Sequence, residues 1–320
     1  MQQTRIRPMT ESGILSAVAI VMIIMSVYLP VLGVVTTVIG PLPLVLLGAR
    51  HGYKWCFLAI VITGLIAAII LQPLIALKVV LLFGSTGIVL GHAIQRGYGP
   101  LKALLMTTVA FIVAMLAILA VSFFVTEINP LAIQLDHMED SIAEAQKMYR
   151  SIGIFNEEEI SERAAMAIAI MELFKLLLPS LLLLISVTYA GVNLLLARVM
   201  LRRLRMKTPV FSPFTEWHLP RSILYVATIV AVMSYWGYYR QVQPLDTISA
   251  NLGVLLVVLF FLQGLSLFYY LADKYNLSRL VKGIILFLTF TNGFCMELTF
   301  FAGLWDVVFD YRRLRSRGLK

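Results

Sequence analysis

The chain consists largely of uninterrupted apolar runs, and eight of them are near the length that an α-helix needs to cross a bilayer. Backbone amides and carbonyls find no water in lipid, so a spanning segment must satisfy its own hydrogen bonds, as an α-helix does. These runs are too long for the strands of a membrane barrel. We therefore expect an all-α, polytopic transmembrane helical bundle. The predicted spans are 14–33, 34–49, 55–75, 76–94, 101–125, 175–199, 223–239 and 252–272.

Composition excludes a water-soluble globular domain. Hydrophobic residues make up 60% of the 320 residues and charged residues 13%, whereas soluble chains have about 45–50% and about 25%. A mean hydropathy of +0.90 leaves more apolar surface than one soluble core could bury, so the lipid bilayer is the expected partner. The net charge of +9 does not indicate nucleic-acid binding, because most of the basic residues flank apolar runs.

The basic residues predict the topology, because short cytoplasmic loops are enriched in Lys and Arg. With the amino terminus inside, the segment 126–172 lies outside the cell. The final apolar run, 283–308, would place the basic tail RRLRSRGLK outside if it crossed once. We expect instead a re-entrant or two-helix hairpin that turns near Asn292, so that both termini face the cytoplasm of a bacterial plasma membrane. The cytoplasmic loops then carry Arg50 and Lys54, Arg96 and Lys102, the basic residues from Arg198 to Lys207, and Lys274, Arg279 and Lys282.

The outer segment 126–172 has a helical pattern of its own. Apolar residues from Leu131 to Ile152 recur at alternating steps of four and three, with acidic residues on other faces, which predicts an amphipathic helix packed on an apolar surface. Further on, Asn156 and Glu159 have the spacing of a helix cap. We expect the helix that they begin to continue into the sixth span.

We divide the chain into two parts. Residues 1–208 hold the first six spans and the outer insertion, and 209–320 hold an interfacial segment, PVFSPFTEWHLP, followed by the remaining helices. In the first part, Pro41 and Pro43 predict a tilted or broken second span.

Sequence motifs give no sign of catalysis. The segment GSTGIVLGH lacks the lysine of a Walker A loop, and neither G-x-S-x-G nor H-E-x-x-H occurs. The four histidines and two cysteines match no metal spacing. We therefore expect no catalytic residue, no metal and no cofactor. An intramembrane enzyme is the remaining alternative, and it would require Glu297 to meet another ionisable side chain in a cavity.

Small residues four apart place two small side chains on one helix face and let another backbone approach closely. Gly13 and Ala17, and Gly87 and Gly91, are the candidates for helix packing or for docking a partner.

Two segments resemble known families. TESGILSAVAIVMIIMSVYLPVLG, followed by GPLPLVLLGARHGYKWCFLAIVITGLIAAII, resembles the start of the S components of energy-coupling factor vitamin transporters, in which an alanine-rich first helix ends near a proline. The ending GLWDVVFDYRRL, Gly303–Leu314, together with the acidic outer insertion, is similar to the YybS-like family of uncharacterised bacterial membrane proteins. The first resemblance covers about residues 1–200, and the second covers nearly the whole chain.

The S-component resemblance implies a six-helix bundle with an outward-facing ligand pocket, docked to a coupling protein and separate ATPases. Its first-helix docking face, Ala-xxx-Ala in that family, is here Gly13/Ala17 with Ser12/Ser16. The resemblance implies small-molecule recognition or transport, of a vitamin or metabolite, without an ATPase of the chain's own. A scaffold or assembly protein of the cell envelope is the alternative. The pocket residues that the resemblance implies are Tyr28, Thr36, Gln72, Lys78, Glu172 and Lys175.

Three of these pocket candidates have a second interpretation. Lys78, Glu172 and Lys175 lie at the predicted outer ends of spans, where long side chains reach the headgroups at little cost. Glu172 and Lys175 are also three apart on one helix face and could pair with each other. A bound anion could use either lysine as its counter-charge.

Overall fold

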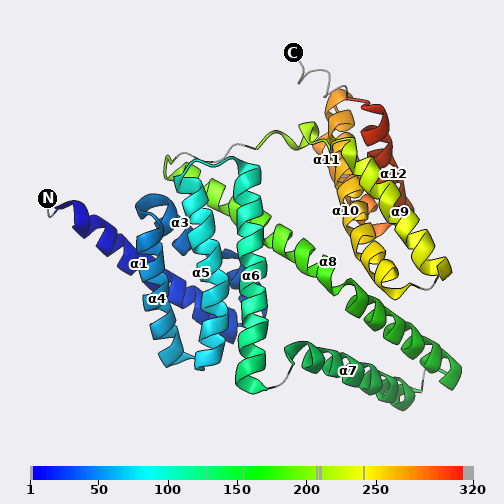
Figure 1. The fold of residues 1–320 in the computed structure, drawn as a ribbon, viewed down its shortest axis with the longest axis horizontal. Helices are drawn as coiled ribbons and strands as arrows, with labels where there is room; N and C mark the ends of the chain where they lie inside the picture. Colours follow the sequence, from blue (N-terminus) through cyan, green and yellow to red (C-terminus); the bar gives the residue numbers. More distant parts are fainter. Residues whose placement is uncertain are drawn as a thin grey trace. The chain divides into compact units, whose positions relative to one another are not determined.

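The computed structural model describes residues 3–127, 129–153, 155–206, 208, 211–240 and 242–312 (Figure 1). These residues form helices and connections without any strand, so the all-α prediction is confirmed. Lys207, the start of the predicted interfacial segment and the basic tail after Arg312 lie outside the described residues. The helices are α1 (Gln3–Tyr28), α2 (Pro30–Ile39), α3 (Leu42–His51), α4 (Tyr53–Ile70), α5 (Pro73–Gln95), α6 (Pro100–Thr126), α7 (Pro130–Ile152), α8 (Glu157–Arg203), the 3₁₀ turn η1 (Phe214–Glu216), α9 (Ser222–Arg240), α10 (Gln243–Lys274), α11 (Arg279–Thr291) and α12 (Gly293–Phe309).

Among the described residues, seven helical segments are long and apolar enough to cross a membrane, and these support the polytopic prediction. Helix α9 is shorter in its apolar part, Ser222–Gly237. The pair α11 and α12 forms one apolar unit bent by 103° at Asn292, where the sequence predicts a turn. The seven segments are Pro8–Tyr28, Val31–His51, Tyr53–Ile70, Pro73–Gln95, Pro100–Thr126, Glu157–Arg203 and Pro244–Lys274.

Two predicted span boundaries are wrong, and prolines explain both. Helix α1 ends at Tyr28 rather than near residue 33, because Pro30 opens α2 at a position where its missing N–H costs nothing. In the same way α4 ends at Ile70, and Pro73 opens α5. The prediction of a broken second span is confirmed, since α2 and α3 are separated at Gly40 and Pro41.

The chain separates into two compact units, 1–172 with 181–210, and 173–180 with 211–320. The boundary that the sequence predicts lies between residues 208 and 209. In the first unit, α5 packs against α1, α3, α4 and α6. Its core includes Phe83, Leu44 and Leu47, all of which are almost completely buried.

Helices α3 and α5 cross at glycines. A Cβ atom added to Gly91 would lie 2.9 Å from both the Gly48 Cα and the Val45 carbonyl oxygen, and one added to Gly87 would lie 2.6 Å from the Leu44 Cβ. Cβ atoms essentially never come this close, so the two helices meet backbone to backbone.

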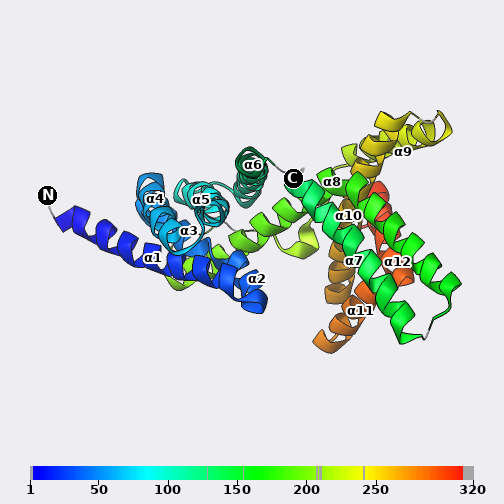
Figure 2. The ribbon, with the colours of Figure 1, turned by 90° about the horizontal axis from the view of Figure 1, so that it is seen from below.

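Helix α7 and the first part of α8, residues 157–172, form a hairpin (Figure 2), which we call the outer hairpin after the predicted outer segment 126–172. Helix α7 starts at Pro130 and ends at Ile152, and the next residue, Gly153, has a φ of 69° that suits glycine. The predicted helix is therefore confirmed, and its partly buried apolar residues, from Leu135 to Tyr149, follow the predicted steps of four and three. The predicted cap is confirmed as well, because Asn156 and Glu159 form a reciprocal capping box. From there α8 continues for 47 residues, which corresponds to about 70 Å.

One turn of α8 is bridged by a side chain from α10. The Asn251 side-chain oxygen accepts from the Ser180 N–H at 2.9 Å, and its amide nitrogen donates to the Leu176 carbonyl at 2.8 Å. These are the two groups that would otherwise bond each other in the helix, next to Pro179. Asn251 thus satisfies the backbone of α8 and fixes residues 173–180 to α10.

In the second unit, α10 packs against α9 and α12. The approach of α10 to α12 is unusually close, because a Cβ atom on Gly264 would lie 1.8 Å from the Thr299 carbonyl oxygen and one on Gly303 would lie 1.9 Å from the Phe260 carbonyl oxygen. At the bend, Asn292 caps α12 by accepting from the N–H groups of Phe294 and Cys295.

Candidate functional site

Two features of the described residues could carry function. They are a buried polar network in the second unit and an open groove on the outer hairpin of the first unit.

The network centres on the ion pair between Arg312 and Asp306, which are 2% and 4% exposed. Asp306 Oδ2 accepts from Arg312 Nη2 at 2.8 Å and from Gln263 Nε2 at 2.5 Å. Arg312 Nη1 also donates to Ser266 Oγ at 2.8 Å. Helices α10 and α12 and the turn after α12 are thereby joined by charge-assisted hydrogen bonds.

The same network holds the segment before α9. Arg312 donates to the carbonyls of Thr215 and Trp217 at 2.6 and 2.7 Å. Gln263 accepts from the Leu219 N–H at 3.0 Å. The described part of the predicted interfacial segment therefore packs on α10 of its own chain. Asp306 Oδ1 is buried without a hydrogen-bond partner among the described residues. Because the other donors and acceptors bind one another, we assign the network a structural role.

The outer hairpin is closed at its tip by side-chain contacts. Arg150 and Glu157 form an ion pair at 3.0 Å, and the rings of Tyr149 and Phe155 meet edge to face at 5.3 Å. The Arg163 guanidinium lies 4.5 Å from the Phe155 ring centre. These contacts join α7 to the first turns of α8.

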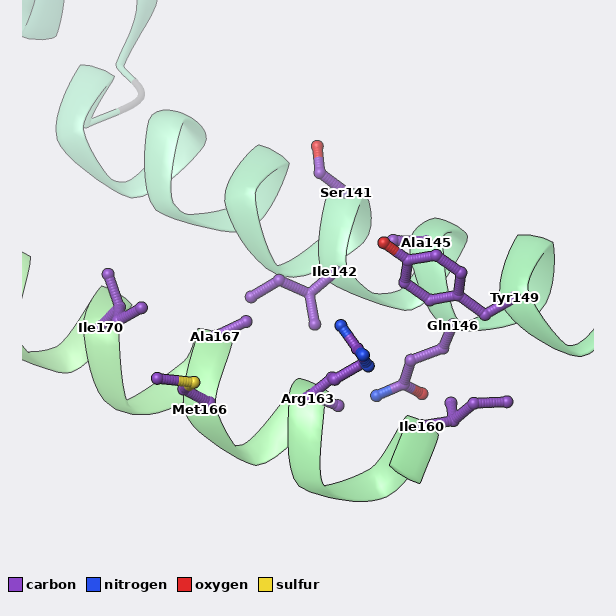
Figure 3. Close-up of a pocket in the computed structure, with 11 residues that line it drawn as sticks. Ser141, Ile142, Ala145, Gln146, Tyr149, Ile160, Arg163, Met166, Ala167 and Ile170 are labelled. Carbon is purple, nitrogen blue, oxygen red and sulfur yellow. The ribbon is translucent and has the colours of Figure 1, made fainter. Parts of the chain in front are cut away.

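Between the two helices lies the hairpin groove, an open cavity of about 400 Å³. Ile142 and Gln146 point into it from α7, and Arg163 points into it from α8 (Figure 3). Its surface is mainly apolar, and its outer edge is exposed, as shown by Met166 at 68% and Ile170 at 60%. The lining residues are Ser141, Ile142, Ala145, Gln146, Tyr149, Ile160, Arg163, Ala164, Met166, Ala167 and Ile170.

The six pocket residues that the sequence suggests do not line the hairpin groove. Tyr28 ends α1 and is 61% exposed. Thr36 is buried in α2, where its hydroxyl donates to the carbonyls of Leu32 and Gly33 in the same helix.

The other four candidates lie on two helices. Gln72 is exposed at the N-cap position of α5, and Lys78 is half-buried further along that helix. Glu172 is exposed and Lys175 is half-buried in α8, and they belong to different compact units. A binding role for the six residues stays a prediction.

The small-residue candidates differ in their surroundings. Gly87 and Gly91 lie in the α3–α5 crossing, whereas Gly13 and Ala17 are exposed on α1, and a Cβ atom on Gly13 would meet nothing within 4 Å. Glu297, which the enzyme alternative requires, is exposed near the start of α12. Within the described residues, no three His, Cys, Asp or Glu side chains gather as a metal site requires.

Sequence reasoning missed the network and the groove. Its family resemblance did single out the segment that contains Asp306 and Arg312, but the partners Gln263 and Ser266 lie more than 40 residues away. For the groove, the signal was the amphipathic period of α7, which marks an apolar face without saying what covers it.

Comparison with known proteins gives two matches. A family model described as "Predicted membrane protein (DUF2232)" matches residues 17–307. The uncharacterised protein YybS of Bacillus subtilis (strain 168) is 24% identical over 315 residues, which cover 98% of this chain and 99% of YybS. No solved structure matches. Neither match extends to S components, so the fold and the transport role that this resemblance implies stay predictions.

Proposed function

Since the chain belongs to the DUF2232 family of membrane proteins, we propose that it is a membrane-embedded scaffold that holds a partner protein on its outer hairpin, α7 with residues 157–172 of α8. The observation that carries this proposal is the apolar surface that this hairpin exposes. No residue of α7 is fully buried, and Met166 and Ile170 of α8 are mostly exposed. Large exposed apolar surfaces mark sites of interaction with proteins or membranes.

The length of α8 supports a position of this surface beyond the hydrocarbon core. A membrane-spanning helix needs about 20 residues, and the stretch 176–197 is free of charged residues. The preceding residues 157–175 include Glu157, Glu158, Glu159, Glu162, Arg163, Glu172 and Lys175. Because so many charges are costly in lipid, we place this part of α8 outside the core.

Polar side chains deep in the second unit also favour a scaffold. Gln263, Ser266, Asp306 and Arg312 bind one another and backbone carbonyls. Groups engaged in this way hold helices together, so they support a structural protein more than a polar substrate pathway.

Small-molecule recognition or transport is the second candidate function, and the volume of the hairpin groove favours it. A cavity of about 400 Å³ falls in the range of about 300–1,000 Å³ that is usual for ligand sites. Ser141, Gln146 and Arg163 would orient such a ligand. Native mass spectrometry of the chain purified in mild detergent would show a bound small molecule or an associated ATPase.

The scaffold proposal can be tested by crosslinking in the native host. A photo-crosslinking amino acid replaces Met166, at the exposed edge of the groove, and in a matched chain it replaces Ala165, which does not line the groove. We expect a discrete protein adduct from position 166 and a much weaker one from position 165. Lipid adducts alone at position 166, or equal protein adducts at both positions, would refute the scaffold.

A further inference from the structure

The outer hairpin has a charge opposite to that of the whole chain. Residues 129–172 contain nine Asp and Glu against three Lys and Arg, a net charge of −6 in a chain of +9. More than half of the chain's 17 acidic residues therefore lie in this one segment. A concentrated negative field of this kind attracts cationic partners and speeds their association.

The same negative charge argues against the possibility that the apolar surface of the hairpin lies on the membrane. Helices that lie in the membrane interface carry Lys and Arg on their polar face, where they meet anionic headgroups. Helix α7 carries four acidic residues, Asp136, Glu139, Asp140 and Glu144, against Lys147 and Arg150. Anionic headgroups would repel this face.

The shape of the groove leaves room for the apolar side chains of a partner. Ala145 on one side and Ala164 and Ala167 on the other are small, so they leave room between the helices, and Ile142 adds apolar surface. Arg163 is the basic residue of the lining, and its guanidinium lies over the ring of Phe155. Apart from Ser141, Gln146 and Arg163, the lining of the groove therefore favours apolar groups.

Acidic side chains lie beside the hairpin groove. Glu139 precedes Ile142 by about one turn of α7, and Glu162 precedes Met166 by about one turn of α8, so each lies near the groove on its helix. Both are exposed. An occupant that places apolar residues in the groove would bring its flanking residues close to these carboxylates.

We propose that the hairpin groove binds a basic amphipathic helix of a partner protein. Its apolar residues enter the groove between Ile142 and Ala167, and its Lys and Arg residues pair with the glutamates beside it. An apolar helix face laid into a groove is a common mode of recognition, with anchors at helical spacing. This inference rests on the proposed scaffold function and names the chemistry of the partner.

The test uses the full chain in nanodiscs of phosphatidylcholine and a fluorescent 18-residue helical peptide of Leu and Lys. The probes for comparison are its scrambled version and a Leu/Glu version. Ala167→Trp fills the groove, and Ala165→Trp adds the same bulk at a neighbouring position that does not line it. We expect Ala167→Trp to weaken binding of the Leu/Lys peptide by at least about tenfold, and Ala165→Trp to leave binding unchanged.

A second pair of variants tests the charge. Glu139→Gln with Glu162→Gln should slow association about threefold at low salt. Asp140→Asn with Glu144→Gln changes the net charge equally at positions two residues to either side of Ile142, and so on the opposite side of α7. This control should have a smaller effect. An equal effect of both pairs, or equal binding of the Leu/Glu peptide, would overturn the proposal.

Because Ala167→Trp could weaken binding by unfolding the hairpin, a thiol-protection experiment tests the groove without that substitution. In Met166→Cys, a membrane-impermeant maleimide should label residue 166, located by peptide mass mapping, and the Leu/Lys peptide should block labelling. A thiol at position 166 that the peptide does not protect overturns the proposal, and so does one that never reacts, because lipid then covers the groove. If the peptide fails but crosslinking at position 166 yields a protein adduct, the scaffold stands and the partner's chemistry is wrong.

Discussion

Replacing Gly303 by alanine tests the packing of α10 on α12. A Cβ atom at this position would lie 1.9 Å from the Phe260 carbonyl oxygen and 2.7 Å from the Gly264 nitrogen. Both contacts are with backbone, so no side chain can move aside. Reaching even 3.0 Å, the shortest distance that real Cβ atoms show, requires the helices to separate by about 1.1 Å.

That separation also reaches the buried network, since Gln263 adjoins Gly264 and Asp306 lies one turn beyond Gly303. A displacement of about 1.1 Å along the bond would lengthen the Gln263 Nε2 to Asp306 Oδ2 distance from 2.5 Å to about 3.6 Å, too long for a hydrogen bond. Overpacking costs about 1–3 kcal/mol, and a lost hydrogen bond to a charged group about 1.5–3 kcal/mol. We expect a loss of about 3 kcal/mol or more.

The assay is thermal unfolding of the full chain in detergent, followed by tryptophan fluorescence. Three of the four tryptophans, at positions 217, 236 and 305, lie in the second unit. Gly303→Ala should lower the midpoint by roughly 6–12 °C. Thiol labelling of Cys56, which is buried in the first unit, should keep its original temperature profile.

The matched control is Gly253→Ala in α10, where an added Cβ atom meets nothing within 4 Å. Alanine is the better helix former by about 1 kcal/mol, so this variant should be as stable as the original chain or slightly more stable. A midpoint for Gly303→Ala at or above that of Gly253→Ala would refute the close crossing.

Three further predictions concern single polar side chains. Arg312→Ala leaves the Asp306 carboxylate buried without its cation and should cost about 3–5 kcal/mol of stability in the same unfolding assay. Arg312→Lys should recover part of this loss, because lysine restores the positive charge without the planar guanidinium. Asn251→Leu leaves the Ser180 N–H without its partner and should cost about 1–3 kcal/mol of stability. The loss should appear as faster hydrogen exchange of the Ser180 amide, and an unchanged exchange rate would contradict the bridge. Asn156→Ala should cost about 1 kcal/mol and speed exchange only in the first turn of α8.

Much of the helical architecture follows from local rules. The caps at Asn156 and the amphipathic period of α7 depend on residues within one or two turns, so the sequence alone predicts them. Helix ends inside continuous apolar sequence are different, because hydropathy does not change at Leu29 or Leu71. There only the positions of Pro30 and Pro73 mark the break.

The contacts between helices could not be predicted in the same way. Neither Gly264 nor Gly303 has a glycine, alanine or serine four residues before or after it, so no such small-residue pair marks the α10–α12 crossing. Asn251 resembles any other intramembrane amide until its two partners on α8 are known. The hairpin groove needs two helices at once, and the period of α7 predicts only one of its walls.

The buried ion pair has a consequence for biosynthesis. Arg312 follows its partners Thr215, Trp217, Ser266 and Asp306 in the chain, so the ribosome adds the cation after every group that it binds. Until then the carboxylate has no counter-charge, and the helices around it cannot close without burying an unpaired charge. A product cut short before this arginine would remain open to the proteases that remove failed membrane proteins.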